Sequence, residues 1–241
     1  ENAITDKTKW VMLNSPSNPS GAAYSFDEMK ALTDVLLKYP NVWIFSDDIY
    51  EHIVYDDFKF YTPVAVEPEL KDRTLTMNGV AKAYAMTGWR IGFCGGPENI
   101  ITAMENIQSQ STSNPTSISQ IAAETALTGD QSCITPMVAA FRERNNFVTE
   151  KLNSIPGIKC LSSDGAFYTF ADTRHAIADL HKKGILTTDN DIAFSEYLLE
   201  QAGVAVVPGS AFGSEGYLRL SFATSMSNLE TALERIKRAL T

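Results

Sequence analysis

The sequence predicts an α/β fold followed by a smaller α+β part, and three observations support this prediction. Short and almost continuous apolar runs alternate with a helical stretch in the first hundred residues, which is typical of a mostly parallel sheet flanked by helices. The pattern turns helical after residue 97, and short strands and helices interleave from about residue 140. Hydrophobic residues make up 44% of the 241 residues, which is enough to build a buried core.

The first hundred residues are expected to hold one helix and four strands. Residues 25–40 predict the helix, because Ser25 can cap its start, Glu28 occupies the capping-box position and Pro40 ends it. In a parallel sheet, ligands gather at the carboxyl ends of the strands, so the residues after each strand are candidates for a site. The apolar runs that predict buried strands cover residues 9–14, 41–48, 73–79 and 89–96.

The rest of the chain is expected to hold helices first and then short strands separated by helices. Gly129 is the expected C-cap of the second helix, and Pro136 is expected to bend the third. This change in the pattern of predicted elements indicates two domains, residues 1–139 and 140–241. The expected helices cover residues 97–110, 116–129, 133–157, 190–202 and 226–240, and the expected strands cover 158–161, 166–170, 204–207 and 217–222.

The composition excludes several classes of function. A net charge of -9 argues against nucleic acid or an anionic membrane as the main partner, because both require clustered Lys and Arg. No apolar run approaches the roughly 20 residues of a membrane span. The cysteines and histidines have neither a disulfide nor a metal-site spacing, so we expect no metal and a reducing, cytoplasmic location. These residues are Cys94, Cys133, Cys160, His52, His175 and His181.

Lys82 is the first candidate for chemistry, because it stands among small residues in the stretch TMNGVAKAYAMTGWRIGFCGG. Burial disfavours the charged form of a lysine, and the neutral amine can attack an aldehyde to form a Schiff base. The alternative is a structural lysine whose stem packs against Tyr84 or Met86.

Two arginines are candidates for anion binding. Arg90 and Arg219 each stand in an apolar run that predicts a strand. A buried guanidinium needs an anion, and its planar fork suits a phosphate or a carboxylate. The alternative for each arginine is an internal ion pair with an Asp or a Glu.

Three further positions complete the candidate set. Asp47 or Asp48 stands at the end of a predicted strand, with Tyr50 just after it. Adjacent acids repel each other, so only one of the two is expected to point into a site; the alternative is a helix cap. The loop NSPSNPSG is rich in proline, and it could hold the Asn18 amide rigidly against a ligand.

These motifs match a known family. The run GVAKAYAMTGWRIG, from Gly79 to Gly92, fits the pyridoxal 5'-phosphate (PLP) attachment signature, and NPSG, SDDIYEHIVY, GAFYTF, GVAVVPGSAFG and RLSFATS follow the family's order. Over nearly its whole length the chain resembles the class I aminotransferases of PLP fold type I, most of all the bacterial aspartate aminotransferases. Ala81 and Gly79 depart from this pattern, since many relatives carry serine at both positions.

The resemblance implies the fold and the organisation of the chain. Residues 1–139 would form the second half of the large PLP-binding domain, and residues 140–241 the small C-terminal domain of a PLP-dependent transferase fold. The chain has no initiator methionine and lacks the glycine-containing phosphate loop, the aromatic residue that stacks on the ring, and the region that reads a side-chain carboxylate. We therefore expect it to begin inside a longer protein and to be inactive alone.

The resemblance also implies roles for the residues around the cofactor. Lys82 would form the Schiff base with PLP and then act as general base and acid. Asp47 would pair with the protonated pyridine nitrogen, a cation that would lower the pKa of Asp47, while Asp48 would face outward. Tyr50 and Asn18 would donate hydrogen bonds to the phenolic oxygen of the ring.

Three more residues receive roles in the same way. Arg90 would bind the cofactor phosphate, Arg219 would hold the substrate α-carboxylate with two parallel hydrogen bonds, and Phe167 and Asn18 would line the substrate side of the site.

The activity implied is transfer of an amino group between aspartate or glutamate and 2-oxo acids. Aromatic amino acids or prephenate are the alternative substrates, and a PLP β-lyase or an inactive fragment without cofactor remain alternatives as well. The family expectation is a homodimer with shared active sites, in which residues 108–120 face the partner.

Overall fold

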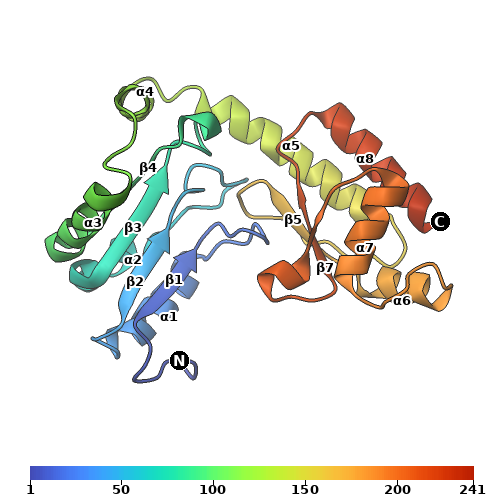
Figure 1. Cartoon of the computed structure of the whole chain (residues 1–241), viewed down its shortest axis with the longest axis horizontal. Helices are drawn as coiled ribbons and strands as arrows, with labels where there is room; N and C mark the ends of the chain where they lie inside the picture. The colour runs from blue at the N-terminus through green and yellow to red at the C-terminus, as the bar shows by residue number, and fades with distance from the viewer. The chain divides into compact units, whose positions relative to one another are not determined.

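A computed structural model describes all 241 residues, which fold into two compact units (Figure 1). The first unit contains residues 1–16 and 23–136, and the second contains residues 17–22 and 137–241. The division after residue 136 lies three residues before the boundary expected from the sequence. The short segment 17–22 was expected in the first domain, but it packs with the second unit.

The first unit is built on a four-stranded sheet in the order β1-β2-β3-β4. The first three strands are parallel, and β4 runs antiparallel to β3. The four strands lie within the four runs predicted from the sequence, although β4 is shorter than its run because a 3-10 turn, Thr87–Trp89, precedes it. They are β1 (Trp10–Asn14), β2 (Trp43–Asp47), β3 (Thr74–Gly79) and β4 (Gly92–Gly95).

The first helix of this unit begins where its cap predicts. Helix α1 (Phe26–Leu37) starts after Ser25, whose hydroxyl accepts from the backbone of Glu28 while the Glu28 carboxylate accepts from Ser25, which completes the predicted capping box. The short α2 and the 3-10 helix after it were not predicted. The remaining elements are α2 (Pro63–Val66), the 3-10 helix Pro68–Arg73, α3 (Glu98–Ser111) and α4 (Ser117–Thr128).

The prediction that the first strand is buried is wrong. Trp10 and Met12 in β1 are exposed, with 73% of Met12 accessible. The physical reason is that alternate side chains of a strand point to opposite faces: Val11 packs against the core, whereas Trp10 and Met12 lie on the other face. The buried core of this unit instead includes a cluster of Leu36, Ile44 and Leu70.

The second unit holds an antiparallel sheet in the order β5-β7-β6. Helix α6 was not predicted. Pro136 is the third residue of α5, and because the first four N–H groups of a helix have no acceptor within it, the missing N–H of proline costs no hydrogen bond there. The elements are α5 (Ile134–Asn153), β5 (Tyr168–Asp172), α6 (Arg174–Lys182), α7 (Asp191–Tyr197) with the π-turn Leu198–Ala202, β6 (Val207–Pro208), β7 (Tyr217–Ser221) and α8 (Met226–Leu240).

The strand predicted over residues 158–161 is wrong. Only Lys159 makes a bridge, to Asp172. The Asn153 side chain binds both backbone polar groups of Cys160: its Nδ2 donates to the carbonyl at 2.8 Å and its Oδ1 accepts from the N–H at 2.9 Å. Because these groups are satisfied by a side chain, no second strand is needed there.

No helix of the chain is long and apolar enough to cross a bilayer.

Candidate functional site

The carboxyl edge of the first sheet gathers several polar residues. Asn14 at the end of β1 lies opposite Asp47 at the end of β2, and its Nδ2 donates to the Asp47 carbonyl at 3.2 Å. Asp47 is in turn the register partner of Met77 in β3. The chain leaves β3 at Gly79 and reaches Lys82 three residues later, so Lys82 follows the carboxyl end of the neighbouring strand.

Lys82 lies beside Tyr50 in the turn that follows β3. Its Nζ is 5.8 Å from the centre of the Tyr50 ring, and Tyr50 is buried, with 3% of its surface exposed. Tyr84 and Met86, the alternative packing partners, lie against the buried cluster that contains Val80. The structure therefore brings Lys82 and Tyr50 together, as the sequence analysis expected.

The Asp47 carboxyl is half-buried, and its pKa in this chain lies above the ordinary value. Burial raises the pKa of Asp47, and this effect outweighs the N–H of Ile49, which donates to Oδ1 at 3.3 Å, and the charge of Lys82, both of which lower the pKa. The lowering implied by the resemblance requires a cation in direct contact with the carboxylate, and it stays a prediction for the chain with PLP bound.

Asp47→Asn is expected to raise the melting temperature at pH 7. In the folded chain Asp47 binds its proton more tightly than in the unfolded chain, so stability falls as the pH rises through its folded pKa. The gain from Asn should shrink as the pH is lowered and vanish below the ordinary pKa of 3.8. Thermal melts between pH 3 and pH 7 measure this, with the exposed Asp6→Asn as control; a gain that is equal at every pH would contradict the explanation.

Asp48 is not outward-facing, and that prediction is wrong. Only 4% of Asp48 is exposed, and its Oδ1 accepts from the Ser46 hydroxyl at 2.6 Å. Residues two apart along a strand share a face, so Asp48 follows Ser46 to the buried side while Asp47 takes the other. Burial is also the main cause that raises the pKa of Asp48.

Arg90 lies outside the strand in which it was expected. It ends the 3-10 turn before β4 with a left-handed backbone (φ 53°), its side chain is exposed, and its Nη1 donates to the Thr87 carbonyl at 3.0 Å. No carboxylate of the chain pairs with Arg90, so the alternative of an internal ion pair is wrong.

Arg219 lies in β7, as predicted, and is held by three side chains of the second unit. Its guanidinium carbon is 4.8 Å from the centre of the Tyr168 ring and 5.1 Å from that of Phe212, and its Nη1 donates to Asn18 Oδ1 at 2.8 Å. We call Asn18, Tyr168 and Phe212 the arginine cage. The Nε of Arg219 is buried without an acceptor, and no carboxylate pairs with this arginine either.

Asn18 reaches Arg219 because residues 17–22 are anchored to the second unit. The Gly21 carbonyl accepts from the backbone N–H groups of Asp164 and Gly165, and the Ser20 carbonyl accepts from the Ser163 hydroxyl. Gly21 has a φ of 69°, and a Cβ there would lie 2.4 Å from the Ser163 Cβ. Glycine is therefore required at this close approach.

Tyr168 and Phe212 were not among the residues predicted for the site. Phe167 was predicted to line the substrate side, from the family resemblance alone. The Phe167 ring lies 4.8 Å from that of Tyr168 and 5.3 Å from that of Phe141. A signal for Tyr168 was present, since GAFYTF puts two aromatic residues side by side and strand alternation sends only one to each face. No comparable signal marks Phe212.

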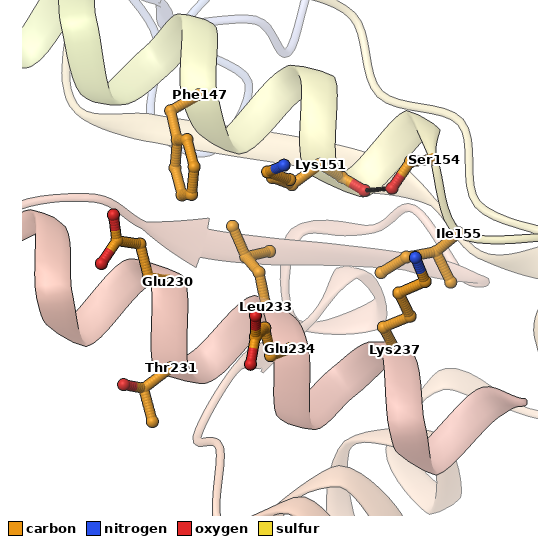
Figure 2. Close-up of a pocket in the computed structure, with 9 residues that line it drawn as sticks. All are labelled: Phe147, Lys151, Ser154, Ile155, Glu230, Thr231, Leu233, Glu234 and Lys237. Atoms are coloured by element: carbon orange, nitrogen blue, oxygen red, sulfur yellow. Dashed lines mark hydrogen bonds between the residues drawn. The ribbon is translucent and has the colours of Figure 1, made fainter.

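A separate groove of about 500 Å³ lies between α5 and α8 of the second unit (Figure 2). Lys151 of α5 and three charged residues of α8 line it, and it contains none of the predicted site residues. Its lining consists of Phe147, Lys151, Ser154, Ile155, Glu230, Thr231, Leu233, Glu234 and Lys237.

Comparison with known proteins identifies related sequences along the whole chain. Residues 1–236 match the family model described as aminotransferase class I and II. The chain is 62% identical over 240 residues to an aspartate/prephenate aminotransferase of Nitrosomonas europaea and covers 60% of that protein. It is 54% identical over 239 residues to an aspartate aminotransferase of Rhizobium meliloti and covers 58% of it. The chain thus spans about three fifths of the length of these relatives.

Solved structures show the same relationship. The crystal structure of the Rhizobium meliloti aspartate aminotransferase matches with a TM-score of 0.92 at 51% identity, over 99% of this chain and 60% of that one. The Thermus thermophilus aspartate aminotransferase with maleate matches with a TM-score of 0.86 at 40% identity, over 99% of this chain and 58% of that one. The fold of this chain therefore corresponds to part of these structures.

Proposed function

Because the chain belongs to the class I and class II aminotransferases, we propose that it is the part of a PLP-dependent enzyme that moves amino groups between aspartate or glutamate and 2-oxo acids. The observation that carries this proposal is Arg219, whose guanidinium is held in the arginine cage without any internal carboxylate and with a buried, unpaired Nε–H. A guanidinium in that state is suited to a carboxylate from outside the chain.

The residues of the first unit fit the cofactor by their chemistry. They offer a primary amine beside a buried phenol, a half-buried carboxylate at a strand end, and an arginine without an ion pair. PLP, when bound, supplies an aldehyde that captures amines and a ring that withdraws electrons from the neighbouring carbon. We assign residues 1–139 to the large cofactor domain and residues 140–241 to the small domain.

Lys82 and Asp47 are assigned the central roles. Lys82 would hold the cofactor through its amine, and its Nζ would take the proton from the substrate Cα and later return it. Asp47 would hold a proton on the pyridine nitrogen. In the chain alone, burial raises the pKa of Asp47. A cationic nitrogen beside the carboxylate would lower that pKa, and the ionised carboxylate would in turn keep the nitrogen protonated.

The remaining residues are assigned binding roles. Tyr50 and Asn18 would donate to the phenolic oxygen of the ring; the Asn18 oxygen accepts from Arg219, which leaves donation to its amide NH₂ group. Arg90 would bind the phosphate. Arg219 would orient the substrate by its α-carboxylate, with Phe167 beside the Tyr168 wall of the arginine cage.

Prephenate is a second candidate substrate, and one observation favours it. The Nitrosomonas europaea relative, at 62% identity, is named for both aspartate and prephenate. We therefore propose that a prephenate-type 2-oxo acid competes with the 2-oxo acids of aspartate and glutamate for the same Arg219 site.

We further propose a cytoplasmic homodimer with shared active sites. Support comes from α3 and α4: Ile107 and Ile121 flank the segment 108–120, Ile118 lies within it, and all three are exposed. Large apolar side chains that are left exposed are candidates for an interaction surface. The three free cysteines agree with a reducing compartment.

Borohydride reduction in the presence of PLP tests the cofactor assignment. We expect one pyridoxyl adduct per chain, mapped by peptide mass spectrometry to Lys82. Lys82→Arg should remove the adduct, and Lys71→Arg, which changes an exposed lysine of the same unit, should leave it unchanged. Adducts spread over several exposed lysines would contradict a specific site. No adduct would support the alternative of an inactive fragment without cofactor, and we expect no transaminase turnover from this chain alone.

A further inference from the structure

Asp191 is a buried acid to which the proposed function gives no role. It is the first residue of α7, and only 1% of its surface is exposed. Its Oδ2 accepts from the backbone N–H of Ser210 at 2.6 Å, and its Oδ1 is buried without a partner. No cation of the chain pairs with the carboxylate. Burying a carboxylate in this way is costly, so the contact that it makes calls for a physical reason.

The start of α7 does not supply that reason. Asn190 is the N-cap of the helix, and its side chain already accepts from the Ala193 N–H at 2.9 Å. The capping position is therefore filled, and the Asp191 carboxylate binds a separate segment that lies after β6.

That segment carries one wall of the arginine cage. Ser210 belongs to the 3-10 turn Gly209–Phe212, and the Phe212 ring at its end lies 5.1 Å from the Arg219 guanidinium. The turn follows directly on β6, in which Val207 is the register partner of Arg219. A Cβ on Gly209 would lie 2.2 Å from the Ser214 carbonyl oxygen, so the turn is tightly confined at its other end as well.

We propose that Asp191 is a positioning residue for Arg219, an inference that rests on the proposed role of Arg219 as the carboxylate-binding residue. By holding the Ser210 N–H, Asp191 fixes the turn and keeps the Phe212 ring against the guanidinium. A guanidinium packed against rings has little side-chain freedom left to lose when it binds an anion. The buried acid thus acts on substrate binding through a turn, without touching the substrate.

The test uses nuclear magnetic resonance of the whole chain, with two readouts. Amide hydrogen exchange at Ser210 reports the bond to Asp191, and the Nε–H resonance of Arg219 reports the neighbouring rings through their ring currents. Asp191→Ala should speed exchange at Ser210 by about tenfold or more and move the Arg219 resonance. Asp191→Asn keeps an acceptor and should restore most of both signals, while Asp189→Asn, the same change at an exposed neighbour, should alter neither.

A further variant separates positioning from general loss of structure. Phe212→Leu should move the Arg219 resonance while leaving Ser210 protected, because the Asp191 bond is intact. If Asp191→Ala speeds exchange at Ser210 but leaves the Arg219 resonance in place, Asp191 is only structural and the proposal is wrong. If Asp191→Ala unfolds the chain, Asp191→Asn takes its place: any faster exchange at Ser210 in this variant should come with a shift of the Arg219 resonance, and faster exchange without a shift contradicts the proposal.

The proposed function fails in a different way. Maleate titrated into the unsubstituted chain should move the Arg219 resonance if Arg219 binds carboxylates. Absence of any maleate response would contradict that role, whereas the effect of Asp191 on the resonance is measured without maleate.

Discussion

Arg219→Lys is expected to weaken maleate binding by about 10- to 150-fold. Lysine keeps the positive charge but loses the planar fork that makes two parallel hydrogen bonds, and a hydrogen bond to a charged group is worth about 1.5–3 kcal/mol. Lysine also cannot pack flat against Tyr168 and Phe212, whose ring centres lie 4.8 and 5.1 Å from the guanidinium. Arg219→Ala should weaken binding further, because the charge is lost as well.

Calorimetric titration of maleate measures this effect. Arg238→Lys makes the same change at an exposed position in α8 and should leave the affinity unchanged. Equal affinities for the unsubstituted chain and Arg219→Lys would show that the arginine does not make a bidentate contact, and the carboxylate-binding role would then be abandoned.

Gly21→Ala should lower the free energy of unfolding by about 2–5 kcal/mol. About 1–2 kcal/mol comes from forcing a side chain into a left-handed backbone with φ of 69°. A further 1–3 kcal/mol, roughly, comes from overpacking, since the new Cβ would lie 2.4 Å from the Ser163 Cβ and 2.9 Å from the Gly165 carbonyl oxygen. The loss should be accompanied by release of Asn18 from Arg219.

Substitutions at two other glycines separate the backbone contribution to this loss of stability from the overpacking contribution. Gly213 has a φ of 77° but open space around it, so Gly213→Ala should show the backbone cost alone. Gly88 has open space and no left-handed backbone, so Gly88→Ala should be nearly neutral. Urea denaturation measures all three variants. A loss at Gly21 no larger than that at Gly213 would show that Ser163 moves aside and that the close approach is not a constraint.

The sequence predicted the elements that depend on local rules. Ser25 and Glu28 marked the start of α1, and the apolar runs marked the four strands of the first sheet, because burial and capping act on neighbouring residues. It did not predict that one face of β1 is exposed, because an apolar run does not show whether both faces of a strand are covered. It also took residues 158–161 for a strand, because nothing local shows that Asn153 satisfies the backbone of Cys160.

The candidate site was predictable in its residues more than in their surroundings. Arg219 was correctly placed in a strand. Its contact with Asn18 joins residues far apart in the sequence, and neither this contact nor the one with Phe212 can be seen in a single sequence. Asp48 was misplaced because the end of β2 decides which of two adjacent acids faces inward. Burial of Asp47, which raises its pKa in this chain, was not predicted because burial is a property of the whole unit.

The anchoring of residues 17–22 to the second unit has a consequence for the order of synthesis. Ser20 lies 143 positions before Ser163, and its carbonyl accepts a hydrogen bond from the Ser163 hydroxyl. At translation rates of about 5–20 residues per second, the segment leaves the ribosome roughly 7–29 s before its partner is made. During that interval the Ser20 and Gly21 carbonyls lack the donors from residues 163–165 that bind them in the folded chain. The arginine cage can form only after Arg219 itself is made, 201 positions after Asn18, so this part of the molecule is organised late in synthesis.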